Sequence, residues 1–311
     1  MITVLAGGVG AARFLRGLLD VVPAQDVTAI VNVGDDLVLH GLHISPDLDT
    51  VTYTLAGAIN PETGWGLAGE SWQAMATVEQ YGGESWFRLG DRDLGTHLYR
   101  TQRLRSGARL SEVTADIVRA WGLGLRVLPA SDDPVRTMVT IAGEGEVSFQ
   151  EYFVGRQHSV PVTAVRFAGV DAATPASGVL DAINVADVVV IAPSNPIVSI
   201  EPVLAIPGVR EAVSARRSRT VAVSPIVAGA ALKGPADRML RELGHEPSVV
   251  GVARLYAGVA SVLVVDDADA ASSADVAAEG IECVVVPTVM SSPDVAAALA
   301  RVTVQSVDVA R

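Results

Sequence analysis

The stretch that decides the fold reads Ala6-Gly7-Gly8-Val9-Gly10-Ala11-Ala12-Arg13. It follows a short apolar run at residues 2–5 and precedes a segment, 11–19, with the pattern of a helix. A strand, a glycine-rich turn and a helix in this order direct backbone N–H groups and the positive end of the helix dipole at a phosphate. The sequence therefore predicts a nucleotide or another phosphorylated ligand at this turn.

The turn departs from the dinucleotide-binding pattern G-x-G-x-x-G, because Arg13 stands at the third glycine position. Gly8 and Gly10 allow a ligand to approach the backbone closely. A guanidinium at position 13 can reach phosphate oxygens with two hydrogen bonds, so we expect these residues to bind phosphate. The alternative is an ordinary strand-to-helix turn in which Arg13 is only solvated.

Apolar, β-branched runs recur along the chain, and helical patterns lie between many of them. The expected strands are 2–5, 27–33, 125–128, 162–167, 188–191, 220–223, 261–265 and 282–286, and the expected helices include 11–19, 112–121, 175–184, 235–243 and 293–302. Continuous apolar runs are typical of parallel strands covered on both faces. The alternation predicts an α/β fold with a doubly wound, mostly parallel, Rossmann-like sheet.

Two segments break this alternation. Residues 49–121 are mainly helical in pattern, which predicts a helical insertion that covers one edge of the sheet, with residues 1–48 and 122–311 as the nucleotide-binding core. Residues 137–141 and 146–153 flank Gly143-Glu144-Gly145, which indicates a β-hairpin.

Composition limits the partners. The 311 residues carry a formal net charge of −12, which argues against binding to nucleic acid or an anionic membrane. No signal pattern opens the chain, and no apolar stretch approaches the ~20 residues that span a bilayer, so we expect a cytoplasmic protein. Cys283, the only cysteine, lies in an apolar run and is expected to pack in the core rather than act as a nucleophile.

Acidic residues follow the second expected strand. Asp35 and Asp36 come directly after it, at the sheet edge where open α/β sheets bind ligands. Asp35 could accept a ribose hydroxyl or hold Mg²⁺, which prefers oxygen ligands, while a plain turn is the alternative. Asp47 or Asp49 could cap a helix expected at 50–57, which would leave the other free for a metal or a hydroxyl.

Two further polar segments are candidates. Asp93 and His97 are spaced i, i+4 and would share a helix face; with other ligands they could hold a metal, although a surface salt bridge is the commoner use. Arg88, nearby, could donate to a substrate oxyanion. Ser194 and Asn195, between two prolines after an expected strand, present a hydroxyl and an amide for a ligand, or form a plain strand exit.

Several motifs occur in a specific order. They are Gly7-Gly8-Val9-Gly10-x-x-Arg13-Phe14, Val31-Asn32-x-Gly34-Asp35-Asp36, Pro46-Asp47-Leu48-Asp49-Thr50, Leu89-Gly90-Asp91-Arg92-Asp93-x-x-Thr96-His97 and Ala192-Pro193-Ser194-Asn195-Pro196. Together, over roughly residues 3–288, they resemble the 2-phospho-L-lactate transferase family of coenzyme F-420 biosynthesis. Gly64-Trp65-Gly66 and the segment 128–133 are most similar to its actinobacterial phosphoenolpyruvate transferase branch.

The resemblance implies a Mg²⁺-dependent transferase. A guanosine diphosphate derivative would donate phosphoenolpyruvate or 2-phospholactate to the terminal hydroxyl of the deazaflavin alcohol Fo, with release of GMP and formation of (dehydro) coenzyme F-420-0. Asp49 and Arg88 match the family's Fo-contacting positions, and Asp49 would be the catalytic base if one is used. We expect Asp35 and Asp49 to hold Mg²⁺ and the insertion at 49–121 to cover the active-site edge and contribute to the acceptor site. The donor would be held by Gly8, Gly10, Arg13, Ser194 and Asn195.

Other functions stay open at this point. A nucleotide-sugar-binding metabolic regulator of a related family would share the sheet and the glycine turn without the transfer chemistry. An NAD-dependent oxidoreductase is disfavoured by Arg13 and by the lack of a clear catalytic Tyr-x-x-x-Lys. We expect small-molecule substrates as partners, and the sequence leaves open whether the chain forms a homodimer.

Overall fold

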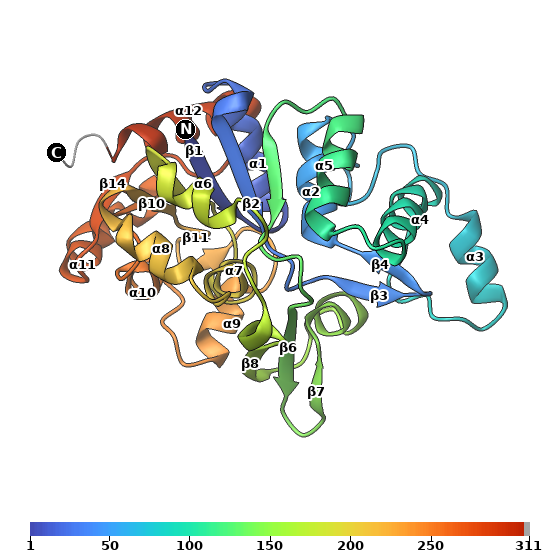
Figure 1. Cartoon of the computed structure of the whole chain (residues 1–311). Helices are drawn as coiled ribbons and strands as arrows, with labels where there is room; N and C mark the ends of the chain where they lie inside the picture. The colour runs from blue at the N-terminus through green and yellow to red at the C-terminus, as the bar shows by residue number, and fades with distance from the viewer. Residues whose placement is uncertain (308–311) are drawn as a thin grey trace.

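One central sheet organises the computed structural model, which describes residues 1–307 (Figure 1). Its seven strands run in the order β14-β13-β10-β9-β1-β2-β5, and every neighbouring pair is parallel. The strands are β1 Ile2–Ala6, β2 Val27–Val31, β5 Arg126–Pro129, β9 Val188–Ile191, β10 Thr220–Val223, β13 Val262–Val265 and β14 Glu282–Val285. The predicted doubly wound parallel sheet is confirmed.

The strand order places the site. From β1 the chain builds one side of the sheet through β2 and β5, then returns to the other side of β1 with β9 and continues outward. The order of the strands therefore reverses between β1 and β9, and ligands of open α/β sheets bind at such a switch point. The glycine turn follows β1, and the loop with Ser194 and Asn195 follows β9.

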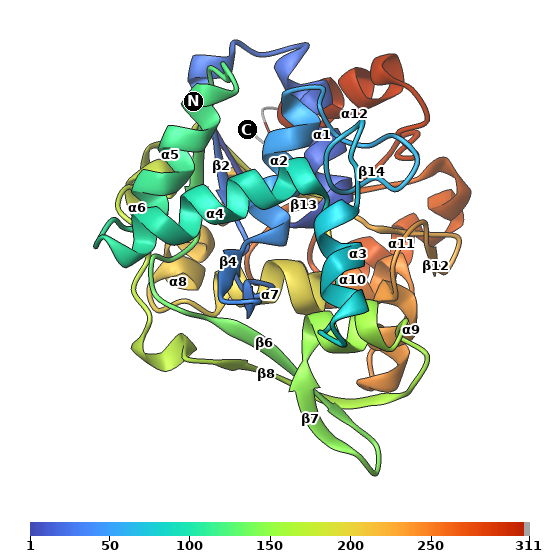
Figure 2. The same ribbon diagram turned by 90° about the vertical axis from the view of Figure 1, so that its right-hand side faces the viewer.

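Helices cover both faces of the sheet (Figures 1 and 2). One face packs on α1 Gly8–Leu19, α2 Pro46–Leu55, α5 Leu110–Ala120 and α12 Pro293–Gln305. The other packs on α6 Val179–Val185, α7 Glu201–Leu204, α8 Val209–Ala215, α9 Ala236–Glu242, α10 Val249–Tyr256 and α11 Ser273–Ala278. Successive strand residues alternate between the faces, so Val4 lies in one core and Leu5 in the other.

The remaining elements extend beyond the carboxyl edge of the sheet (Figure 2). They are the hairpin β3 Leu37–Leu39 with β4 Leu42–Ile44, the short pair β11 Ile226–Val227 with β12 Ala230–Ala231, and the helices α3 Gln73–Gln80 and α4 Asp91–Arg105. A separate antiparallel sheet has the order β7-β6-β8, with β6 Arg136–Ile141, β7 Gly145–Ser148 and β8 Val162–Ala168. The division into a core and an insertion at 49–121 stays a prediction.

The structure corrects some local predictions. The hairpin around Gly143-Glu144-Gly145 is confirmed, but its second strand ends at Ser148 and a short helical turn, Glu151–Gly155, follows. The strand predicted at 162–167 forms as β8, yet its place in the parallel sheet was wrong, because it pairs antiparallel with β6. Several of its side chains are exposed, whereas the central strands of the main sheet are buried throughout.

The helix predicted at 50–57 begins earlier, at Pro46, a residue suited to the first helical position. Neither Asp47 nor Asp49 caps it, since Ser45 occupies the cap position and both acids lie in the first turn. Cys283 lies half-buried in β14, where burial raises the pKa of its thiol. Within residues 1–307, no helix combines the length and apolarity needed to cross a membrane.

Candidate active site

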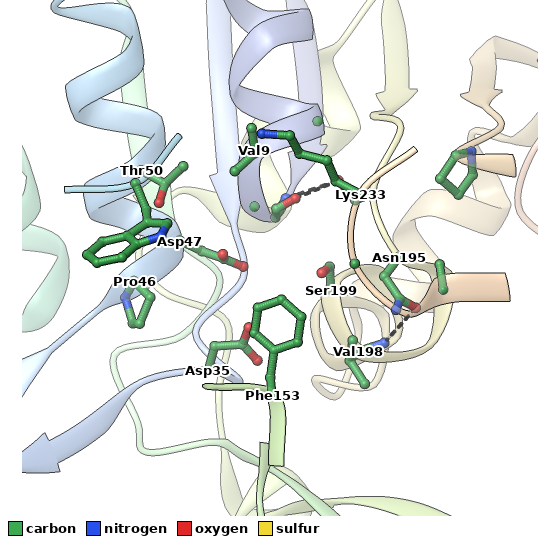
Figure 3. A pocket seen from close by; sticks show the side chains of 18 of the residues that line it. Val9, Asp35, Pro46, Asp47, Thr50, Phe153, Asn195, Val198, Ser199 and Lys233 are labelled. Carbon is green, nitrogen blue, oxygen red and sulfur yellow. Dashed lines mark hydrogen bonds between the residues drawn. The ribbon is translucent and has the colours of Figure 1, made fainter. Parts of the chain in front are cut away.

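A cavity of about 540 Å³ opens at the switch point of the sheet. Its walls come from the glycine turn, the start of α2, the loops after β9 and β10, the segment before α9 and parts of residues 65–97 (Figure 3). All the predicted site residues line it, namely Gly8, Gly10, Arg13, Asp35, Asp49, Arg88, Ser194 and Asn195. The structure thus brings the predicted residues together, while their individual roles stay predictions.

The glycine turn is packed too tightly for side chains. A Cβ built at Gly10 would lie 2.2 Å from the carbonyl oxygen of Pro193, and Gly8 has a φ of +70°, which favours glycine. Helix α1 therefore begins directly against the loop that follows β9. Its first N–H groups lie at the cavity, as the binding of an anion at a helix N-terminus requires. Arg13, one turn later, is exposed and also lines the cavity.

Ser194 and Asn195 join the loops of the site. The backbone N–H of Gly7 donates to the Ser194 hydroxyl oxygen at 3.3 Å, and this hydroxyl donates to the Gly7 carbonyl at 2.8 Å. The Asn195 side-chain oxygen accepts from the backbone N–H groups of Ile197 and Val198 at 2.9 and 3.4 Å (Figure 3). The Ser194 bonds hold the loop after β9 against the glycine turn across the switch point, whereas the Asn195 bonds cap the helical turn that follows within that loop.

Asp35 and Asp47 point into the same part of the cavity (Figure 3). Oδ1 of Asp35 is buried without a hydrogen-bond partner. Burial raises the pKa of Asp35 well above its usual range, and the negative charges of Asp47 and Asp36 raise it further. Burial also raises the pKa of Asp47 to about 6, although Asn32 donates to its carboxylate at 3.0 Å. Asn32 and the backbone N–H of Gly8 hold Asp47, whereas Oδ1 of Asp35 faces the cavity wall without a partner.

Asp36, the second acid of the Gly-Asp-Asp motif, lies beside this pair but faces elsewhere. It accepts a hydrogen bond from the Ser45 hydroxyl at 2.7 Å, and burial raises its pKa to about 8. It lines a second cavity of about 600 Å³, which also contains Arg136 and Arg156 in its wall. Asp35 borders both cavities.

Asp49 is held by an arginine that sequence reasoning missed. Arg100 is 2% exposed, and its guanidinium donates to both carboxylate oxygens of Asp49, with Nη1 3.1 Å from Oδ2. The same Nη1 lies 3.2 Å from Nδ1 of His97. Since a guanidinium only donates, His97 accepts there and carries its proton on Nε2. Arg100 lies three residues after His97 and seven after Asp93, a helical spacing that places all three on one face.

Asp93 and His97 continue this network. Nε2 of His97 lies 3.4 Å from Oδ2 of Asp93, and the Tyr53 hydroxyl donates to Oδ1 of Asp93 at 2.7 Å. Burial raises the pKa of Asp93, but the hydrogen bonds from His97 and Tyr53 and the Arg100 charge outweigh it, so the pKa lies below its usual value. Ligand atoms of Asp49, Asp93 and His97 lie within 4.8 Å of one another, but the Arg100 guanidinium already supplies positive charge there.

Aromatic side chains form the outer wall on the α3–α4 side. Trp65 is 45% exposed and meets Trp72 edge to face, with ring centroids 6.3 Å apart. The guanidinium carbon of Arg88 lies 4.8 Å from the Trp72 ring centre. Arg88 is therefore positioned at the cavity by a cation–π contact, and Trp65 presents free aromatic surface beside it.

Known proteins resemble this chain over almost its whole length. A phosphoenolpyruvate transferase of Streptomyces griseus subsp. griseus is 48% identical over 305 residues, covering 96% of each chain. Another, of Mycolicibacterium smegmatis, is 42% identical over 315 residues, again covering 96% of each. A solved UPF0052 family protein of Bacillus halodurans shares the fold, with a TM-score of 0.63, 19% identity and coverage of 97% of this chain and 98% of that one. The family model "2-phospho-L-lactate transferase CofD" matches residues 2–302, and the chain therefore belongs to that family, the one its motifs indicate.

Proposed function

We propose that this transferase moves a phosphoenolpyruvate or 2-phospholactate group from a guanosine-diphosphate-linked donor to the deazaflavin Fo, releasing GMP. The supporting observation is a single cavity with a phosphate-binding glycine turn on one wall and acidic and aromatic side chains on the other. Its actinobacterial relatives are named phosphoenolpyruvate transferases, which favours the enolpyruvyl donor. The product would then be dehydro coenzyme F-420-0.

The donor's two phosphates fit the wall formed by α1. The N–H groups that begin the helix and its dipole attract negative charge, and the absence of side chains at Gly8 and Gly10 lets the diphosphate approach them. Arg13 lines the cavity one turn further along, where its guanidinium can reach phosphate oxygens. Ser194 contributes by fixing the turn, since its hydroxyl is bonded to Gly7 in both directions.

The acidic pair fits a magnesium ion. Asp35 offers a buried oxygen with no partner, and it lines the cavity beside Asp47, a second buried carboxylate. Oxygen ligands of this kind suit Mg²⁺, which when bound would neutralise charge on the phosphates. We first expected Asp49 to bind the ion together with Asp35. Both carboxylate oxygens of Asp49 accept hydrogen bonds from Arg100, however, so Asp47 is the better second ligand in this proposal.

The acceptor fits the opposite wall. The planar ring system of Fo would lie against Trp65, as aromatic surfaces stack by offset contact, with Arg88 at its edge. Asp49 would then accept the hydrogen bond of the terminal ribityl hydroxyl. The hydroxyl oxygen forms a bond to the distal phosphorus and the bond to the bridging oxygen breaks. GMP leaves with the electron pair, while the hydroxyl proton passes to Asp49.

One assay tests this proposal. The protein is incubated with Fo, Mg²⁺ and guanosine diphosphates linked to either phosphoenolpyruvate or phospholactate, and the products are identified by mass. We expect GMP and one phosphodiester of Fo, with the enolpyruvyl donor used faster. Binding of the donor with no transfer to Fo would contradict the proposal and indicate a nucleotide-binding regulator.

A further inference from the structure

We propose that Lys233 is a specificity-determining residue that binds the diphosphate of the donor, an inference that rests on the proposed function for the identity of that ligand. Lys233 is the only lysine in the sequence, whose other basic residues, apart from the histidines, are all arginine. It lies in the segment between β12 and α9 and lines the cavity. The resemblance to the family assigns it no role.

The position of its ammonium group is specific. Nζ of Lys233 lies 3.3 Å from a Cβ built at Gly64, and that same Cβ position is 3.9 Å from Cγ1 of Val9. Figure 3 shows the side chain extended across the cavity toward Val9, which belongs to the first turn of α1. Lys233 therefore brings a positive charge to the point where the glycine turn meets the loop containing Gly64 and Trp65.

This charge has no partner in the part of the chain that the structure describes. Among residues 1–307, no carboxylate lies within salt-bridge distance of Lys233 and no acceptor receives its ammonium hydrogens. Of the two arginines that line the cavity, Arg88 already lies over Trp72, while Arg13 is exposed one turn into α1. An unpaired ammonium beside the start of α1 is suited to a phosphate.

An ammonium group also suits the distal phosphate in particular. Gly64 and Trp65 belong to the acceptor wall and Val9 to the donor wall, so Lys233 lies where the two substrates would meet. A lysine is a compact point charge with rotatable donors, which can follow phosphate oxygens as the distal phosphorus passes from one oxygen to another. The rigid, planar guanidinium of an arginine is instead suited to phosphate oxygens that keep one fixed arrangement.

The single lysine allows a direct test. The full-length protein is treated with a limiting amount of an amine-acetylating reagent, and modified peptides are quantified by mass spectrometry. The N-terminal amine, which is 2.9 Å from Asp187 and outside the cavity lining, serves as the internal control. We expect inorganic pyrophosphate and GDP to protect Lys233 several-fold while guanosine does not, with labelling of the N-terminus unchanged in every sample.

Variants complete the test. K233Q should weaken GDP binding in calorimetry by about tenfold, the loss typical of one charged hydrogen bond, and K233R should recover part of it. Fo binding should not change. Equal labelling with and without pyrophosphate, together with GDP binding by K233Q at wild-type affinity, would overturn the assignment. If the wild type binds no GDP but pyrophosphate still protects Lys233, the proposed donor is wrong and the phosphate-binding lysine stands.

Discussion

The guanidinium of Arg100 binds both carboxylate oxygens of Asp49, joining α4 to the first turn of α2 inside the protein. Arg100 is 2% exposed and Asp49 is 5% exposed. Each of these buried charges is stabilised by the other, so removing one of them leaves the remaining charge buried without a partner. Arg100 therefore fixes the orientation of the acid that we propose faces the acceptor hydroxyl.

Removing the charge of Arg100 alone should lower the free energy of unfolding more than removing the charges of both Arg100 and Asp49. R100M leaves a buried charge on Asp49 and should lower the free energy of unfolding by about 3–5 kcal/mol, whereas the double variant R100M/D49N should recover part of that loss. R100K keeps the charge but loses the bidentate geometry. Urea unfolding of the wild type, R100M, D49N and R100M/D49N gives the coupling energy. Additive effects of the two single changes would show that the residues act independently.

Gly10 should tolerate no side chain. A Cβ there would lie 2.2 Å from the Pro193 carbonyl oxygen, so G10A must push α1 away from the loop after β9, and we expect GDP affinity to fall by at least tenfold. G95A is the matched control, because a Cβ at that exposed position in α4 meets no atom within 4 Å. Calorimetric titration with GDP compares them. Unchanged affinity in G10A would place the diphosphate elsewhere.

Trp65 should contribute to acceptor binding only. W65A should weaken Fo binding by up to about tenfold, since aromatic stacking contributes about 0.5–1.5 kcal/mol, and W65F should retain most of the affinity. Y81A is the control, because Tyr81 is 81% exposed and lies outside the cavity lining. Quenching of Fo fluorescence measures all three. An equal loss of GDP affinity in W65A would indicate a general collapse of the cavity wall.

The buried acids should couple stability to pH and to Mg²⁺. Burial raises the pKa of Asp36 to about 8 and that of Asp47 to about 6, above the value of about 4 for an unfolded aspartate. The folded metal-free protein therefore holds protons that the unfolded chain has lost, so its free energy of unfolding should fall as pH rises from about 4 to about 8.

Mg²⁺ should oppose this effect, because it competes with the protons for the same carboxylates. Thermal unfolding with EDTA or with Mg²⁺ at pH 5.5 and pH 8 measures the stabilisation by the ion, which we expect to be larger at pH 8. D35N should abolish most of it, whereas D132N, distant in the sequence and absent from the cavity lining, should not. Equal stabilisation at both pH values would remove the acidic pair as the binding site.

The sequence alone predicted those parts of the fold that depend on local pattern. Continuous apolar runs predicted the central strands, and the glycine turn predicted the junction of β1 and α1, because both features follow from neighbours in the chain. The strand at 162–168 was assigned to the wrong sheet, since its pairing with β6 is a tertiary choice that periodicity does not encode. The predicted Asp caps failed because Pro46 begins α2 before either acid.

The site was predicted less completely, for a similar reason. Acids and glycines after strands could be placed at one edge from topology alone. Arg100 and Lys233 could not, because the contact of Arg100 with Asp49 and the place of Lys233 in the cavity wall depend on packing of the whole chain. The spacing of Arg100 from Asp93 and His97 indicates that the three residues share a helix face. That Lys233 is the only lysine is also evident from the sequence.

The central claim is that one cavity holds the diphosphate at the glycine turn and the acceptor hydroxyl at Asp49. A crystal structure with GDP, Mg²⁺ and Fo bound tests it most directly. We predict the phosphates against the N–H groups that begin α1, the ion at Asp35 and Asp47, and the ribityl hydroxyl within hydrogen-bonding distance of Asp49. Phosphates bound instead in the second cavity, beside Arg136 and Arg156, would contradict the account.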